Sequence, residues 1–217
     1  VVVGPAGAGE AFPQVVEHVF GNLDAERPDG VAHGVTITRA AYSGPVSAFA
    51  LPASNGVLPA QWIRKAIDAG IITADDAIPE RNVQPASLDL RLGDEAYRLR
   101  ASFLAGSTTV ERKLEEFAVG PPIDLRSGAI LERNRPYLIP LQERLALPAN
   151  LRALANPKSS TGRLDVFTRV ITDRSFQFDE IRKEYRGRLY LEVVPRSFTV
   201  IVRTGSALNQ LRLRTGD

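Results

Sequence analysis

The chain of 217 residues has no cysteine and no methionine, and it has only two histidines. Without cysteine it can form no disulfide, thiol nucleophile, iron–sulfur cluster or thiolate zinc site of its own. The two histidines, His18 and His33, lie far apart in a weakly patterned region, which fits no compact metal motif. The composition therefore excludes thiol chemistry and argues against a histidine-bound metal.

Long apolar runs are also missing. No run approaches the roughly 18 residues that a membrane span requires, so we expect no membrane partner. No basic and apolar signal peptide opens the chain, and we expect a cytoplasmic protein. Because methionine is absent even from position 1, we expect a fragment or a processed product.

The first 50 residues contain a glycine pattern that resembles a phosphate-binding loop without its chemistry. Gly4 and Gly9 have the spacing of the P-loop, but Glu10 and Ala11 stand where its lysine and hydroxyl belong. A glutamate at that position would repel phosphate. We interpret the start as a strand and a glycine turn, followed by a short helix in "FPQVVEHVFGNL" and a strand in "HGVTITRAAY". Residues 1–50 are thus predicted to be an N-terminal extension of unknown role.

Charge is distributed unevenly along the chain. Residues 1–150 carry 14 basic and 18 acidic side chains, whereas residues 151–217 carry 13 and 7. The excess of basic side chains in residues 151–217 should produce a positive field that suits an anionic ligand, although a solvated charged face would show the same excess. The basic residues are not interleaved with exposed aromatics, so we expect no nucleic-acid partner.

From residue 51 onward the pattern predicts one mainly β domain, residues 51–217. Trp62, Ile63, Ala66 and Ile67 recur at helical spacing after a proline, and Gly70 marks the end of that helix. Alternating apolar residues then predict many short strands, beginning with "SLDLRLG" and ending with "ALNQLRLRTG". A charged piece, "VERKLEEF", is a further helical candidate.

Glu192 lies in "GRLYLEVV", a strand with apolar residues on both faces, as in the centre of a sheet. A carboxylate there is unfavourable unless it is paired with a cation or takes part in catalysis. Partial burial favours the protonated form, which suits a general acid and base. The alternative is a structural Glu paired with an arginine, and the strand alone favours that alternative.

Two turns carry further candidate residues. In "NPKSSTGR", Ser159 and Arg163 have the spacing of one helical turn, so their side chains would point the same way and could hold phosphate; a helix cap with a surface arginine is the alternative. In "FDEIRKEYRGRL", Asp179 could hold a sugar hydroxyl and Tyr185 could stack on a sugar or base, although the segment also suits an ordinary charged turn.

Together these stretches resemble a known family. The segments "VQPASLDLRLG", "NPKSSTGRLDVFTRVIT", "FDEIRKEYRGRLYLE" and "SALNQLRLR" occur in the order seen in the dCTP deaminases of the dUTPase-like superfamily. The resemblance covers about residues 52–217 and is greatest to the long, tandem bacterial form. It implies a distorted β jelly roll (a β-clip) with an N-terminal helix, which assembles as a trimer or pseudo-trimer with nucleotide sites between subunits.

The resemblance also implies a reaction: zinc-independent hydrolysis of dCTP to dUTP and ammonia, with Mg²⁺ bound through the triphosphate. By similarity, Glu192 is the general base and acid, and Ser159 and Arg163 position water and substrate. The residues similar to substrate-binding residues of the family are Lys158, Ser160, Thr172, Asp179, Tyr185 and Gln210.

The chain departs from the family pattern at several points. Lys158 stands where an arginine is usual, which keeps the charge but loses the bidentate fork. Thr172 replaces a smaller residue, and the segment from Asp179 to Tyr185 is lengthened. The arm that usually closes over the triphosphate is missing from these residues. A dUTP diphosphatase or bifunctional enzyme, and a non-catalytic nucleotide-binding or structural module, therefore remain as alternatives.

Overall fold

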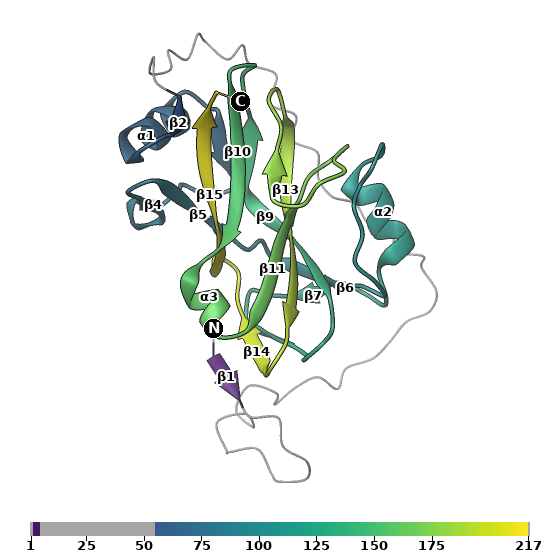
Figure 1. Cartoon of the computed structure of the whole chain (residues 1–217). Coiled ribbons are helices and arrows are strands. Elements are labelled where there is room, and N and C mark those ends of the chain that lie inside the picture. Colours follow the sequence, from purple (N-terminus) through teal and green to yellow (C-terminus); the bar gives the residue numbers. More distant parts are fainter. Residues whose placement is uncertain (1, 5–54, 217) are drawn as a thin grey trace, which may run out of the picture.

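The strands of this protein form three antiparallel sheets (Figure 1), which confirms the mainly β prediction. The computed structural model describes residues 2–4 and 55–216. The helix and the strand predicted between residues 11 and 42, and the predicted domain boundary at residue 50, lie outside the described residues. The predicted first strand is present as β1 (Val2–Gly4), which pairs with β14.

The first six-stranded sheet carries the end of the chain at its centre. Its order is β12-β10-β15-β5-β4, with β2 pairing to β15. The strands are β2 (Gly56–Val57), β4 (Val83–Gln84), β5 (Ser87–Arg91), β10 (Leu151–Pro157), β12 (Glu180–Ile181) and β15 (Ala207–Thr215).

The second six-stranded sheet carries Glu192. Its order is β11-β13-β9-β6-β7, with β3 pairing to β9. The strands are β3 (Ile72–Ala74), β6 (Glu95–Arg98), β7 (Ile123–Asp124), β9 (Tyr137–Ala146), β11 (Val166–Ile171) and β13 (Arg186–Pro195). A third, small sheet has the order β1-β14-β8, with β8 (Ala129–Leu131) and β14 (Thr199–Val202).

The alternating leucines of β5 enter the core as predicted. Leu88 and Leu90 of the strand, and Leu92 just after it, are almost fully buried. The opposite face of β5 is buried too, because Arg91 forms an ion pair with Glu143 of β9 at 2.7 Å. Burial raises the pKa of Glu143, while the Arg91 guanidinium and backbone N–H lower it. This pair joins the two large sheets.

The helices of the described residues are short: α1 (Ala60–Asp68), the 3₁₀ turn η1 (Glu80–Asn82), α2 (Val110–Phe117) and α3 (Ser159–Arg163). The helix α1 buries Ile63 and Ala66, and the chain turns away at Gly70, which has a positive φ of 71°. No helix among the described residues is long and apolar enough to cross a membrane.

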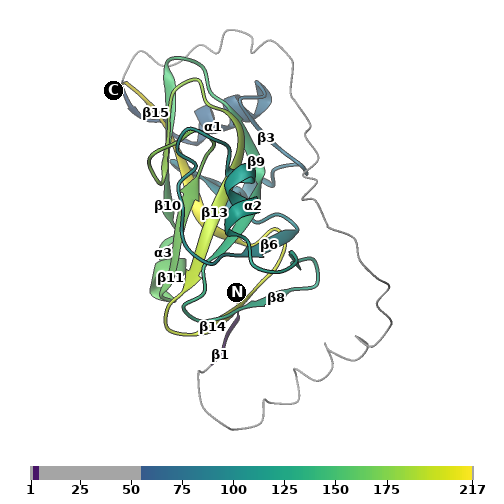
Figure 2. The ribbon, with the colours of Figure 1, turned by 90° about the vertical axis from the view of Figure 1, so that its right-hand side faces the viewer.

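The helix α2 covers one face of the second sheet (Figure 2), where Val110 and Leu114 pack in a cluster with Tyr190. Two side chains cap its start. Thr109 accepts a hydrogen bond from the Arg112 N–H, and Asp173 accepts one from the Val110 N–H at 2.7 Å. The cap from Asp173 ties α2 to the loop that follows β11.

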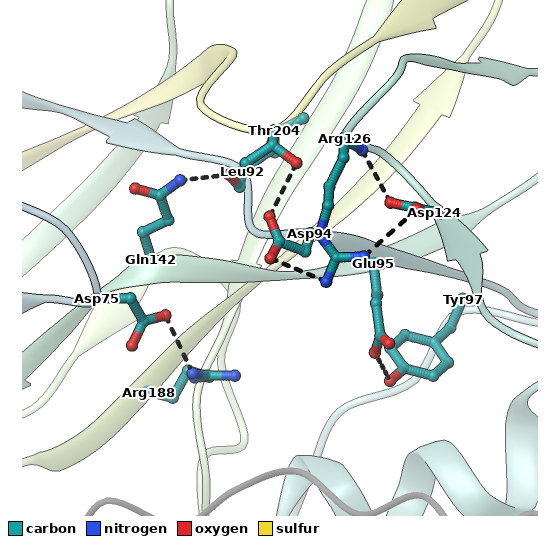
Figure 3. Close-up of polar contacts among 10 residues, drawn as sticks. All are labelled: Asp75, Leu92, Asp94, Glu95, Tyr97, Asp124, Arg126, Gln142, Arg188 and Thr204. Atoms are coloured by element: carbon teal, nitrogen blue, oxygen red, sulfur yellow. Dashed lines mark hydrogen bonds and ion pairs between the residues drawn. The ribbon is translucent and has the colours of Figure 1, made fainter.

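The chain crosses from the first large sheet to the second at the turn between β5 and β6. Side chains from three other segments hold this turn (Figure 3). Gln142 donates to the Leu92 carbonyl at 3.2 Å, Thr204 donates to Asp94 at 3.0 Å, and Arg126 pairs with Asp94 at 3.3 Å. A crossing fixed from several sides sets the relative position of the two sheets, and therefore of the candidate residues on each.

Candidate functional site

Glu192 lies in the middle of the second sheet, because β13 pairs with β11 on one side and with β9 on the other. Its register partners are Arg169 and Leu138. The side chain is only 2% exposed. The prediction of a central strand with a buried carboxylate is therefore confirmed.

The buried carboxylate of Glu192 has two polar partners. Ser102 Oγ donates to Glu192 Oε2 at 2.8 Å, and Arg169 Nη2 donates to the same oxygen at 3.0 Å. Arg169 Nη2 also lies 2.6 Å from Ser102 Oγ. The guanidinium lies near two aromatic rings, 3.7 Å from the Phe178 centroid and 4.9 Å from that of Phe167. Glu192 is thus paired with an arginine. This pairing is what the alternative interpretation of Glu192, as a purely structural residue, predicted.

Asp179 lies close enough to Arg169 and Glu192 for both charges to act on its carboxylate. Its backbone has a positive φ of 63°, a region that aspartate adopts more readily than most residues. Asp179 Oδ1 accepts from the Val170 N–H at 2.8 Å, and its own N–H donates to the Val170 carbonyl. Burial raises the pKa of Asp179; the Val170 N–H and the Arg169 charge lower it, and the charge of Glu192 raises it again. We call Glu192, Asp179, Arg169 and Ser102 the carboxylate cluster.

Thr172 and Tyr185 are both buried, and Thr172 lies just beyond the end of β11. The Tyr185 hydroxyl donates to the Arg188 carbonyl at 2.5 Å and accepts from the Asp173 N–H at 3.4 Å. Burial raises the pKa of Tyr185. A Cβ on Gly187 would lie 2.8 Å from this hydroxyl, so only glycine allows the close approach. The ring and the hydroxyl are used internally, and the predicted roles of Tyr185 and Thr172 in substrate binding stay predictions.

The residues of the second candidate group lie on α3, at the end of β10 and beside the start of β11 (Figure 1). As predicted, the turn is helical. Ser159, Ser160 and Arg163 are exposed, and their side chains have no hydrogen bond or ion pair with any described residue. Hydroxyls and a guanidinium without internal partners are available to an anion or to another chain.

Lys158 and Gln210 connect α3 to the first sheet. Lys158 forms an ion pair with Asp89 of β5. Gln210 accepts from Ser87 Oγ at 2.8 Å and donates to the Pro157 carbonyl at 3.5 Å. Beside them is a pocket of about 590 Å³, with a lining that includes Arg81, Asn82, Asp89, Arg91, Gln142 and Lys158. We call Lys158, Ser159, Ser160, Arg163 and Gln210 the cationic turn.

The structure brings the predicted residues together in two groups rather than one. No hydrogen bond or ion pair between described residues links the cationic turn to Glu192, and the pocket beside Lys158 is not lined by Glu192. The strand β11 connects the two groups along the chain, and they lie on different sheets.

Three contact residues were missed by the sequence reasoning: Ser102, Arg169 and Asp89. The alternation of Phe167 and Arg169 in "DVFTRV" places them on one face of β11. The position of Arg169 opposite Glu192, however, depends on the register between β11 and β13. Ser102 comes from a loop 90 residues earlier in the chain. Among the residues that the structure describes, no group of three or more acidic, histidine or cysteine side chains could hold a metal ion.

The sheet arrangement is that of a jelly-roll domain of the dUTPase-like type. Residues 54–217 match the family "2'-deoxycytidine 5'-triphosphate deaminase (DCD) N-terminal domain". The chain therefore belongs to the dCTP deaminase family.

Individual relatives agree with this assignment. A solved structure of 2'-deoxycytidine 5'-triphosphate deaminase from Agrobacterium tumefaciens is similar with a TM-score of 0.73 and 50% identity, covering 75% of this chain and 49% of that one. A dCTP deaminase of Natronomonas pharaonis is 35% identical over 108 residues, 48% of this chain and 54% of the relative. A "dCTP deaminase, dUMP-forming" of Methanothermobacter thermautotrophicus is 30% identical over 145 residues, 63% and 67% respectively. The chain thus spans about half the length of the first two relatives.

Proposed function

We propose that this chain provides the catalytic carboxylate for the hydrolytic deamination of dCTP to dUTP and ammonia. The observation that supports this most directly is Glu192, a carboxylate buried in a central strand of a chain that belongs to the dCTP deaminase family. Such a group has the two properties that proton transfer at a nucleobase requires. It is shielded from bulk water, and a neighbouring cation fixes its orientation.

The proposed reaction moves protons through Glu192. The carboxylate takes a proton from water as the water oxygen attacks C4 of the cytosine ring. Glu192 then gives that proton to N3, and the hydroxyl proton on C4 passes through Glu192 to the amino group. The C4–N bond breaks, ammonia leaves and the C4 carbonyl of uracil forms. No zinc is required in this scheme, and the chain lacks the cysteines with which zinc deaminases bind it.

The cationic turn is proposed to bind the triphosphate. The side chains of Ser159, Ser160 and Arg163 have no hydrogen bond or ion pair with a described residue. Arg163 is positively charged, and so is Lys158, which also pairs with Asp89. Mg²⁺ would then arrive bound to the phosphate oxygens, which are the ligands that this cation prefers. The chain itself would not need to supply a cage of protein ligands for the ion.

Assembly is part of the proposal, because no hydrogen bond or ion pair between described residues links the cationic turn to Glu192. A trimer or pseudo-trimer could bring the cationic turn of one domain to the carboxylate cluster of its neighbour. Such an arrangement would complete one nucleotide site from two subunits. Sedimentation of the purified protein would test this, and a monomer that turns over dCTP would contradict it.

A second candidate reaction is supported by the names of relatives. Three of them, among them the relative from Methanothermobacter thermautotrophicus, are named "dCTP deaminase, dUMP-forming". In that case a second water would attack the α-phosphate, and Asp179 is the carboxylate we propose to orient it. A non-catalytic module that binds nucleotide without turnover is the remaining alternative.

The deciding experiment is chromatography of dCTP and dUTP after incubation with the purified protein and magnesium. Conversion of dCTP to dUTP with release of ammonia would support the deaminase. Appearance of dUMP and diphosphate would support the bifunctional enzyme. If both nucleotides bound and neither changed, the chain would be a non-catalytic module.

A further inference from the structure

The two oxygens of Glu192 have different surroundings. Oε2 accepts both hydrogen bonds of the carboxylate, from Ser102 and from Arg169. Oε1 has no hydrogen-bond partner among the described residues. Oε1 is also not fully enclosed by the protein, so solvent can reach it. One oxygen is therefore held by the protein, while the other is left for something outside it.

Arg169 is itself held more firmly than a surface arginine. The guanidinium lies over the ring of Phe178 and near that of Phe167, and only 25% of its side chain is exposed. A guanidinium that stacks on aromatic rings keeps its planar fork in one orientation. Lysine has no such fork, so the geometry depends on arginine and not only on positive charge.

Ser102 closes the arrangement into a triangle. Its hydroxyl donates to Glu192 Oε2 at 2.8 Å while accepting from Arg169 at 2.6 Å. Because the hydroxyl both donates and accepts, it fixes the distance between the two charged groups. A carboxylate held at one oxygen by two donors cannot rotate freely about its last bond.

We propose that Arg169, assisted by Ser102, is a positioning residue that fixes Glu192 through Oε2 and leaves Oε1 as the oxygen that exchanges protons with water and base. This inference rests on the proposed deaminase function. It assigns the reacting atom, and it adds two residues that the resemblance to the family did not supply.

The test is a set of variants with steady-state kinetics on dCTP. We expect Arg169→Ala to lower kcat about 100-fold, the effect of a small misplacement of a reacting group, with KM changed less than about threefold. Arg169→Lys should recover only part of the loss. Added guanidinium chloride, at concentrations too low to unfold the protein, should raise kcat of Arg169→Ala about tenfold, the effect of one hydrogen bond to a charged group.

Arg196→Ala is the matched control. Arg196 is exposed just after β13, and its side chain has no hydrogen bond or ion pair with a described residue, so this variant removes the same charge without touching the cluster. Its kcat should be unchanged, and guanidinium should not raise it. Circular dichroism would show that each variant is folded.

Three outcomes would overturn the inference. Arg169→Ala could keep kcat, or it could lose kcat without rescue by guanidinium, which would indicate a purely structural role. In both cases the wild-type protein still deaminates dCTP, so the proposed function stands. An inactive wild-type protein would instead remove the proposed function, and the role of Arg169 with it.

Discussion

The carboxylate cluster and the cationic turn satisfy their polar groups in opposite ways. Glu192 is buried and held by two donors, whereas the side chains of Ser159 and Arg163 are exposed and have no hydrogen bond or ion pair within the described part of the chain. Groups that the protein itself holds are pre-organised for chemistry, because little reorganisation remains when a substrate arrives. Groups without partners are available to bind a ligand or another subunit. The difference assigns chemistry to one region and binding to the other, and the variants below test that division.

The largest effect is expected for Glu192→Gln. The amide keeps the shape of the side chain but can no longer accept and return a proton, so kcat should fall by about 10²- to 10⁴-fold. Nucleotide affinity, measured by calorimetry, should change little because the cationic turn is intact. Retained turnover would remove Glu192 from the acid and base role and would leave the pairing with Arg169 as its only purpose.

A smaller effect, on stability, is expected for Lys158→Met. The variant leaves the Asp89 carboxylate, only 8% exposed, without its ion-pair partner. The free energy of unfolding should fall by about 1–3 kcal/mol, the cost of an unsatisfied buried group. Urea denaturation measures it, with Lys158→Arg as the control that keeps the charge. An unchanged midpoint for Lys158→Met would show that water in the adjacent pocket solvates Asp89.

Arg163→Ala should act on the nucleotide site and not on stability. The side chain is exposed and has no hydrogen bond or ion pair with a described residue, so the melting temperature should stay the same. If Arg163 contacts the triphosphate, affinity for dCTP should fall about tenfold, the equivalent of one charge-assisted hydrogen bond. Calorimetry with Arg163→Lys as the control would separate charge from the bidentate fork. Full affinity in Arg163→Ala would show that α3 is only a helical cap.

Most of the fold was predictable from the sequence because its signals are local. The alternation around Leu88 and Leu90 predicted β5, and the helical spacing before Gly70 predicted α1. Glu192 could be assigned to a central strand for the same reason. Its partners could not be predicted, because Arg169 meets it only through strand register and Ser102 only through the position of a distant loop. The sequence also could not show that the two candidate groups lie apart, since β11 brings them close along the chain.

The smallest effect tests whether the carboxylate cluster is arranged for stability or for chemistry. Burial raises the pKa of Asp179, so the folded protein binds its proton more tightly than the unfolded chain does. The ionised carboxylate therefore lowers stability at pH values above the raised pKa, and this penalty fades as the pH falls through it. Asp179→Asn keeps an oxygen for the Val170 N–H and removes the charge. We expect its melting temperature to exceed that of the wild type slightly at neutral pH, and the difference to shrink in acid.

The opposite result for Asp179→Asn would revise the comparison. A variant that melts lower at neutral pH would mean that attraction between Asp179 and Arg169 outweighs the burial of the carboxylate. The cluster would then be a stabilising ion network in which Arg169 is shared between two carboxylates. In that case Arg169→Ala should lower the melting temperature markedly and lower kcat only slightly. A gain at neutral pH instead means that the fold retains a buried charge at a cost in stability, as sites built for proton transfer commonly do.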